Sequence, residues 1–323
     1  MPRTAARIPF VLLLIGLLAG PACAADDPPR IVTSIAPIHS LVAAVTDEAA
    51  EPYLLVPPGQ SPHTFSLAPS DTRAIARADA IFTVGGPADR FLERTLGSLA
   101  GDSVHIELLE IQEVHRLPAR SGGHWHHAHG DADHAESGHS AQTASAPDGH
   151  TTDPHAWLDP ENAIAFARAV AATLAELDPA RAPTYRANAA ALAQRLTDLD
   201  DRLHERLTPI AERPYLVFHD AYQYFERRYG LNAVGSVVVD PGRPPGAARL
   251  RALRRRIAEQ DVACLFVEPQ FEPRIADTVV EDTGARIATL DPLGAALEPG
   301  PSLYPRLLQR MAESLRGCLG RDS

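Results

Sequence analysis

Three histidines and one aspartate stand where apolar runs of the sequence give way to polar or proline-containing segments. His63 lies in Pro-His-Thr-Phe, His155 in Asp-Pro-His-Ala-Trp, His219 in Phe-His-Asp-Ala-Tyr and Asp291 in Leu-Asp-Pro-Leu-Gly. Imidazole nitrogens and carboxylate oxygens both bind divalent metal ions, so the four residues together would form a compact metal site. Taken singly, each also fits a structural role, such as a helix cap for Asp291 before Pro292.

A second group of histidines is concentrated in one polar segment. Half of the 14 His residues lie there among Gly, Ser, Ala and acidic residues, a low-complexity composition typical of metal binding. Chelation by a flexible chain costs ordering entropy, so we expect these histidines to bind a metal ion more weakly than a preformed site. The alternative is a solvated insertion whose histidines have no specific role. The residues are His124, His126, His127, His129, His134, His139 and His150.

Length and charge exclude some classes of function. The chain has 323 residues, enough for about two domains at roughly 100–200 residues each, and 45% of its residues are hydrophobic. It carries 41 acidic against 30 basic residues, every basic residue is Arg, and the formal net charge is −11. Because phosphate neutralisation dominates nucleic-acid affinity, we expect no nucleic-acid partner.

The N-terminus has the pattern of a secretory signal peptide. Two arginines precede the apolar run 8–19, and small residues lead up to a cleavage site after Ala24. We therefore expect residues 1–24 to be removed and the mature protein to work in the periplasm. A lipid anchor at Cys23 is disfavoured, because Gly20 stands where a lipobox usually has a large aliphatic residue.

Strand-like and helix-like segments alternate on both sides of the polar segment. This alternation predicts an α/β fold of two βα lobes with mostly parallel sheets, whose strand ends face a cleft. We expect the N-terminal lobe over 25–182, including a mobile loop over about 113–153, and the C-terminal lobe over 212–323.

One long helix is predicted between the lobes. The segment 183–211 has leucines at three- to four-residue spacing, and such a helix would span about 40 Å at ~1.5 Å per residue. It would connect the lobes rigidly and leave the metal site in the cleft between them. Just before it, Asp159-Pro160 predicts the N-cap and first residue of another helix.

Several motifs follow one another in the order found in a known family. The motifs begin at Ser34 (Ser-Ile-Ala-Pro-Ile), Pro62 (Pro-His-Thr-Phe-Ser-Leu-Ala-Pro-Ser-Asp), Asp153 (Asp-Pro-His-Ala-Trp-Leu-Asp-Pro), Phe218 (Phe-His-Asp-Ala-Tyr), Glu268 (Glu-Pro-Gln-Phe) and Leu290 (Leu-Asp-Pro-Leu-Gly). With the histidine-rich insertion, the chain resembles the metal-specific solute-binding proteins of bacterial ABC importers, in their zinc-specific, ZnuA-type branch. The resemblance covers nearly the whole mature chain.

The resemblance implies a ligand set. His63, His155 and His219 match the metal ligands, whereas Asp291 matches a carboxylate that binds metal directly in some members and not in others. The family's manganese binders typically have Glu in place of His219, so a third imidazole favours Zn²⁺. Some zinc binders have an acidic residue where Pro62 stands here, which favours Asp291 or water as the fourth ligand.

The remaining implications concern the cysteines and the partners. With Cys23 removed, Cys264 and Cys318 are left, and an even pair in an exported protein favours a disulfide. The zinc branch has matching cysteines that tie the last helix to the second sheet. The family implies a monomeric, non-enzymatic protein that binds Zn²⁺ with high affinity and delivers it to an inner-membrane ABC permease with its ATPase subunit.

Two other functions fit parts of the sequence. A secreted zinc-dependent hydrolase would need three protein ligands and an activated water, but Thr208 stands where the second His of a His-Glu-x-x-His motif starting at His204 should be. Glu161, Asp220 and Glu268 are conceivable general bases, although each is better explained as a helix-end or structural residue. The second alternative is a periplasmic zinc buffer or chaperone without a transporter.

Overall fold

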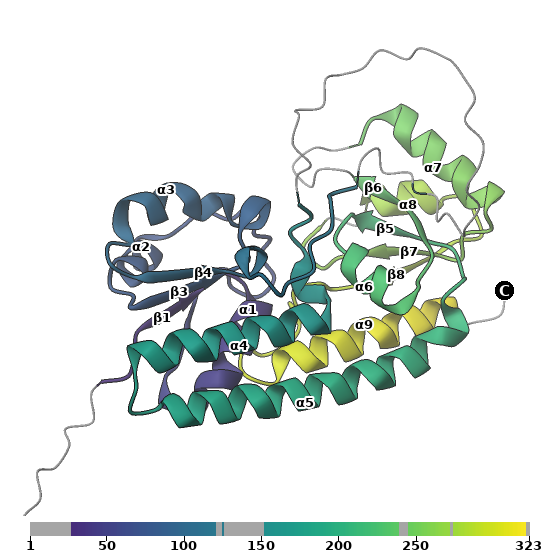
Figure 1. Ribbon diagram of the computed structural model, residues 1–323. Coiled ribbons are helices and arrows are strands. Elements are labelled where there is room, and N and C mark those ends of the chain that lie inside the picture. Colours follow the sequence, from purple (N-terminus) through teal and green to yellow (C-terminus); the bar gives the residue numbers. More distant parts are fainter. Residues whose placement is uncertain (1–26, 121–124, 126–151, 239–244, 272–273, 321–323) are drawn as a thin grey trace, which may run out of the picture.

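The computed structural model describes residues 27–120, 125, 152–238, 245–271 and 274–320, which form two parallel β-sheets with helices packed around them (Figure 1). The expected α/β fold with two βα lobes is therefore confirmed. Within these residues no helix is both long enough and apolar enough to cross a membrane. The expected signal peptide, 1–24, lies outside the described residues.

The N-terminal lobe contains a four-stranded parallel sheet in the order β2-β1-β3-β4. Its two central strands are buried at every position, which explains their continuous apolar sequences. The elements are β1 Ile31–Thr33, α1 Ala36–Thr46, η1 Asp47–Ala49, β2 Tyr53–Leu54, α2 Pro69–Ala76, β3 Ala80–Thr83, η2 Gly86–Asp89, α3 Arg90–Leu99, β4 Val104–Glu107 and η3 Leu108–Glu110.

The C-terminal lobe repeats this arrangement with the order β6-β5-β7-β8, again all parallel. Strands β5 and β6 are fully buried, so β5 carries its last residue to an edge enclosed by protein. The elements are β5 Tyr215–His219, α6 Gln223–Tyr229, β6 Ala233–Val238, α7 Ala247–Glu259, β7 Cys264–Val267, α8 Arg274–Val280, β8 Arg286–Thr289 and α9 Leu303–Leu319.

Two helices connect the lobes. The helix α4, Pro160–Leu177, begins as its sequence predicts: Asp159 Oδ1 accepts a hydrogen bond from the Glu161 backbone N–H at 2.9 Å, and Pro160 is the first helical residue. The predicted long helix is α5, Ala182–Leu207, followed by η5, Thr208–Ile210. In Figure 1, α5 runs beneath both lobes.

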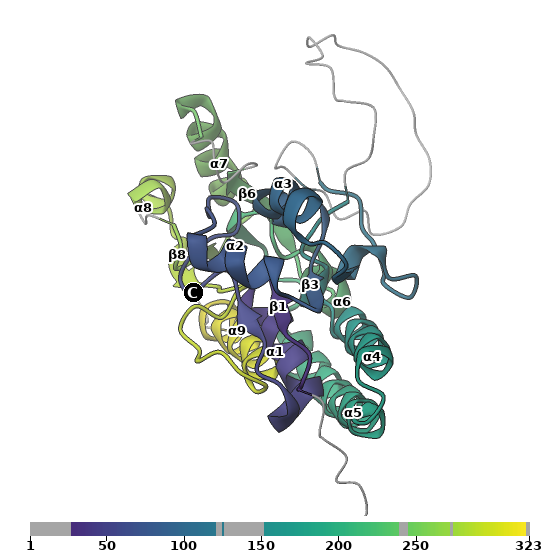
Figure 2. The ribbon, with the colours of Figure 1, turned by 90° about the vertical axis from the view of Figure 1, so that its left-hand side faces the viewer.

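One hydrophobic core extends from the first lobe to the second through a layer of helices. Figure 2 shows α1, α4, α5 and α9 gathered below the two sheets. The buried face of α5 has the spacing expected of a helix packed along one side. Its fully buried side chains belong to the same cluster as those of β1 and β5, so the lobes are not packed independently. These side chains are Tyr185, Leu192, Leu196, Leu199, Leu203 and Leu207.

The described ends of the insertion between β4 and α4 are packed against the protein. Val114, Leu117 and Trp125 are buried, and Pro118 pairs with Thr152 in an isolated antiparallel bridge. The polar composition of this region gave no reason to expect a buried Trp125. The rest of the expected mobile loop lies outside the described residues.

The disulfide expected from the cysteine count is confirmed. Cys264 in β7 and Cys318 in α9 are bonded, which attaches the last helix to the second sheet across a sequence separation of 54. Closing a loop of this length restricts the unfolded chain.

We predict that replacing both Cys264 and Cys318 by Ala lowers the free energy of unfolding by about 4 kcal/mol, the value from loop-closure entropy. Urea unfolding of the wild type with and without reductant, beside the double variant, measures the effect. Equal unfolding midpoints for all three samples would contradict the prediction.

Candidate metal centre

The structure brings three of the four predicted ligands together between the lobes. Each of His63, His155 and His219 offers a ring nitrogen, and these nitrogens lie within 4.8 Å of one another. The ring centroids are 5.0 Å apart for His155 and His219, 5.3 Å for His63 and His219, and 6.0 Å for His63 and His155. Three nitrogens at this separation can bind one ion.

Each histidine is placed by a different local feature. His219 is the last residue of the buried strand β5. His155 directly precedes the short helix η4, Ala156–Leu158, and His63 lies on the loop between β2 and α2. The first and second lobes therefore each supply a ligand from the carboxyl-end side of a strand, as expected for an open parallel sheet.

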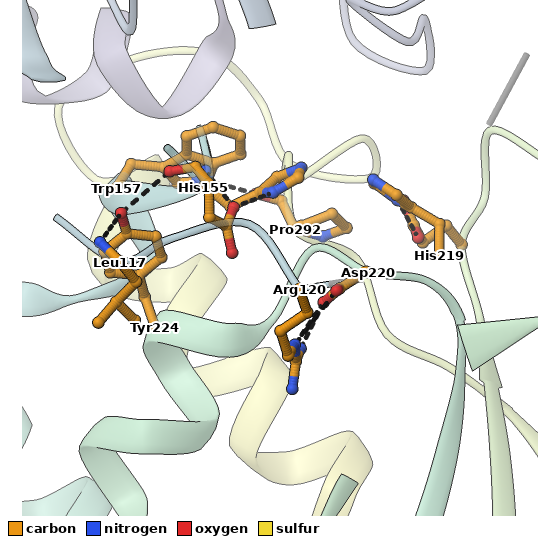
Figure 3. A network of polar contacts seen from close by, with 10 residues as sticks. Leu117, Arg120, His155, Trp157, His219, Asp220, Tyr224 and Pro292 are labelled. Atoms are coloured by element: carbon orange, nitrogen blue, oxygen red, sulfur yellow. Dashed lines mark hydrogen bonds and ion pairs between the residues drawn. The ribbon is translucent and has the colours of Figure 1, made fainter. Parts of the chain in front are cut away.

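Two of the imidazoles are held by buried carboxylates. Asp153 Oδ1 lies 2.7 Å from His155 Nδ1, and Glu268 Oε1 lies 2.9 Å from His219 Nδ1. Figure 3 shows the two rings on either side of one space, each with a dashed bond to its carboxylate. A neutral imidazole that donates its Nδ1–H to a carboxylate keeps the Nε2 lone pair for a metal and gains basicity.

The protonation of the histidines differs with their surroundings. Burial, with the neighbouring rings of His219 and His155, lowers the pKa of His63 to about 3, so this ring is neutral at physiological pH. Burial is the largest single influence on His219 and lowers its pKa, but the charge and hydrogen bond of Glu268, together with the charges of Asp220 and Asp153, raise that pKa above its ordinary value of 6.5.

Aromatic side chains enclose the histidines. The Trp157 ring centroid lies 5.2 Å from that of His155, and the Phe271 ring centroid lies 5.8 Å from that of His219. Trp157 Nε1 donates to the Pro292 carbonyl at 2.9 Å, which links the His155 segment to the Asp291 loop. Apolar walls around a polar ligand set reduce competition from water.

Asp291 is not part of the compact group of three histidines. Its Oδ1 accepts hydrogen bonds from the backbone N–H groups of Leu293 at 3.1 Å and Gly294 at 2.9 Å, and so caps the turn that follows β8. One carboxylate oxygen is therefore committed to the backbone.

A second group of possible ligand atoms lies at the start of α4. His115, Asp159 and Glu161 also have ligand atoms within 4.8 Å of one another. However, Asp159 caps α4, and Arg228 Nη1 lies 2.9 Å from Glu161 Oε1. The Arg228 guanidinium already supplies a positive charge beside these acidic residues. We therefore interpret His115, Asp159 and Glu161 as a helix cap with an ion pair and not as a metal site.

The structure accounts for the remaining histidines of the sequence differently. His39 Nε2 contacts the Pro52 carbonyl at 3.1 Å, and His105 Nε2 contacts Thr83 Oγ1 at 2.9 Å. These two have structural roles. The predicted accessory ligands His124, His126, His127, His129, His134, His139 and His150 lie outside the described residues.

Sequence reasoning did not identify the carboxylates that hold the ligands. Asp153 precedes His155 by two residues, and this short spacing was a usable signal. Glu268 follows β7, the strand next to β5 that ends in His219, so strand order would have indicated the contact. Arg120, whose guanidinium bonds Asp220 beside His219, had no signal in the sequence.

We predict that metal binding weakens as the pH falls from about 8 to about 6, because a proton on His219 competes with the metal and the pKa of this group is raised. Glu268→Gln removes the charge that raises this pKa, so proton competition should move to lower pH. The affinity for Zn²⁺ at high pH should also fall about 10–100-fold, because the His219 ring loses its charged carboxylate partner. Zn²⁺ competition titrations across this pH range measure both effects.

The metal-free protein provides the control. The pKa of His219 is higher in the folded protein than its ordinary value of 6.5 in the unfolded chain, so protonation of His219 stabilises the fold. This stabilisation is fully present below pH 6.5 and is lost as the pH rises through the folded-state pKa. In Glu268→Gln burial is no longer offset by the charge of Glu268, so in thermal unfolding the loss of stability as the pH rises through the pKa of His219 should disappear. Identical pH profiles for variant and wild type, in binding and in unfolding, would contradict the assigned role of Glu268.

Sequence comparison identifies a family and its members. Residues 31–318 match the family described as zinc-uptake complex component A, periplasmic. The high-affinity zinc uptake system protein ZnuA of Brucella suis is 40% identical over 306 residues, covering 90% of this chain and 92% of that protein. The protein of the same name from Paracoccus denitrificans is 38% identical over 316 residues, covering 95% of this chain and 96% of that protein.

Solved structures share the fold. A crystal structure of ZnuA superimposes with a TM-score of 0.75 at 25% identity, covering 91% of this chain and all of that one. A zinc-bound deletion mutant of ZnuA gives a TM-score of 0.74 at 25% identity, covering 92% of this chain and all of that one. With the family match extending over both lobes and the three-histidine centre, the chain belongs to the ZnuA family of periplasmic zinc-uptake components.

Proposed function

We propose that the protein captures Zn²⁺ at His63, His155 and His219 in the periplasm and delivers it to an ABC-type import permease. The observation that carries the proposal is the arrangement of three imidazole nitrogens within 4.8 Å of one another, two of them on rings held by carboxylates. The relatives named as high-affinity zinc uptake proteins support the same cargo.

The donor set favours zinc over manganese. Zn²⁺ is a borderline-soft ion suited to imidazole nitrogen in tetrahedral geometry, whereas Mn²⁺ prefers a larger share of oxygen ligands. A ring with a pKa near 3, such as His63, gives up no proton when it binds metal at neutral pH. We propose that Asp291 or a water molecule completes the coordination.

The carboxylates near the histidines all have bonding partners, which favours transport over catalysis. These carboxylates belong to Asp153, Asp220 and Glu268. Asp153 bonds His155, Glu268 bonds His219, and Asp220 is paired with Arg120. A zinc hydrolase would need a carboxylate free to take a proton from a metal-bound water. The engagement of these three side chains supports a binding protein whose cargo leaves unchanged.

The wider features of the chain complete the proposal. Cleavage after Ala24 would release the protein into the periplasm, where the disulfide is compatible with an oxidising environment. The histidine-rich insertion would serve as a weaker accessory site that collects zinc near the main centre. The partner would be an inner-membrane permease with its ATPase subunit, contacted by a monomer.

We predict one tight Zn²⁺ site in the chelator-stripped mature protein, with Mn²⁺ a poor competitor. This site should survive deletion of residues 126–150, which keeps the buried Trp125, whereas weaker sites should disappear with the deletion. His219→Ala should weaken the tight site by more than the about 10–100-fold that loss of an outer partner costs. Competitive titration with a calibrated chelator measures all of these changes.

Asp291→Asn is the matched variant for the fourth ligand. A large loss of affinity would assign Asp291 to the metal, and an unchanged affinity would assign water. Loss of all tight zinc binding on deletion of 126–150, or preferential binding of Mn²⁺ by the deletion variant, would contradict the proposed centre.

A further inference from the structure

Arg120 pairs with two carboxylates at the foot of the histidine-rich insertion. Its Nε lies 3.1 Å from both carboxylate oxygens of Asp220, its Nη2 also donates to Asp220, and its Nη1 donates to Glu226 Oε2 at 2.7 Å. The exposed fraction is 14% for the side chains of Arg120 and Asp220 and 2% for Glu226. A guanidinium fork held in this way is strong and strongly directional.

Trp125 covers the guanidinium from the other side. The Arg120 Cζ lies 3.5 Å from the Trp125 ring centroid, a cation–π contact shielded from water because Trp125 is 7% exposed. The backbone of Trp125 is also fixed: its N–H donates to the Val234 carbonyl at 3.3 Å, and its carbonyl accepts from Arg256 Nη1 at 3.3 Å. The foot of the insertion is thereby attached to the C-terminal lobe.

The same chain segment contacts the supports of two metal ligands. Asp220 directly follows His219, and Figure 3 shows the Arg120 fork facing Asp220 just below the two histidine rings. At the other end of the segment, the Leu117 carbonyl accepts from the Asp153 N–H at 2.8 Å. Tyr224 Oη, on α6, accepts from the Leu117 N–H and donates to the Asp153 carbonyl, both at 2.9 Å.

These contacts connect the two ligands through one segment. Residues 117–120 are bonded to Asp153, which holds His155, and to Asp220, which is joined to His219. The Nδ1 bond of His219 to Glu268 fixes the ring, and the pairing of His219 with Val238 fixes the backbone up to the end of β5. The bond from Arg120 to Asp220 restrains the turn that follows the strand.

We propose that Arg120 is a positioning residue for the metal centre. By binding Asp220 while Trp125 covers its guanidinium, Arg120 keeps His219 in a fixed position relative to His155 and so slows metal release. The inference rests on the proposed function, because it concerns zinc bound at the three histidines. Loss of the Arg120–Asp220 interaction should mainly increase the dissociation rate of zinc, since the three histidines themselves remain. It should also change the coordination geometry, which a merely stabilising ion pair would not do.

The test compares Arg120→Met with Arg228→Met in the mature full-length protein. Arg228 also bridges two acidic residues, Asp200 and Glu161, and within the described part of the chain its hydrogen bonds and ion pairs reach neither a proposed ligand nor a residue next to one. We expect Arg120→Met to release zinc about tenfold faster or more in a chelator chase, within the range seen when an outer partner of a ligand is lost. The visible absorption spectrum of the Co²⁺-loaded protein should change too, whereas Arg228→Met should leave both unchanged.

Two further variants keep the test decisive. Arg120→Lys retains the charge without the fork and should restore only part of the wild-type release rate. Trp125→Leu retains the ion pair between Arg120 and Asp220 but exposes it to water. This variant should release zinc faster than the wild type but more slowly than Arg120→Met, and its release rate can be measured even if Arg120→Met does not fold.

Three outcomes would overturn the inference. A folded Arg120→Met with the wild-type release rate and Co²⁺ spectrum would do so. So would equal acceleration by Arg228→Met, because that would indicate general loss of stability. If Arg120→Met does not fold, an unchanged release rate in Trp125→Leu would overturn it. Failure of the wild type itself to bind zinc is a distinct result that would refute the proposed function.

Discussion

Two hydrogen bonds between carboxylates and imidazoles are the constraint on which this structure depends. Asp153 fixes the ring of His155, and Glu268 fixes the ring of His219, so that each ring turns its other nitrogen toward the same point. Both carboxylates are nearly buried, which is unfavourable unless they are paired. The fold must therefore bring each carboxylate to its ring before any metal arrives.

The packing of the elements meets this requirement and leaves the two lobes little freedom to move relative to each other. Neighbouring strands β5 and β7 place His219 beside Glu268 at one edge of the sheet. The core continues through α4, α5 and α9 beneath both lobes, and the Cys264–Cys318 bond attaches α9 to β7. Because the ligands are ordered in advance, binding zinc costs little conformational entropy, which favours high affinity.

The parts of this account that the sequence could predict are those encoded locally. The leucine spacing of α5, the Asp159 cap of α4 and the three histidines proposed as ligands each follow from short patterns or motifs, and the structure brings these histidines together. The burial of Trp125 and the pairing of Arg120 with Asp220 could not be predicted, because a separation of 100 residues is bridged only by tertiary packing. Local composition even suggested the opposite for Trp125, since the residues around it are polar.

The most direct test of the central claim is the coordination of zinc itself. X-ray absorption spectroscopy at the zinc edge, on the variant lacking residues 126–150 loaded with one equivalent of zinc, reports the atoms bound to the metal. We predict three imidazole nitrogens at about 2.0–2.1 Å and a single further light-atom ligand. A spectrum with fewer imidazoles, or one that His219→Ala leaves unchanged, would contradict the account.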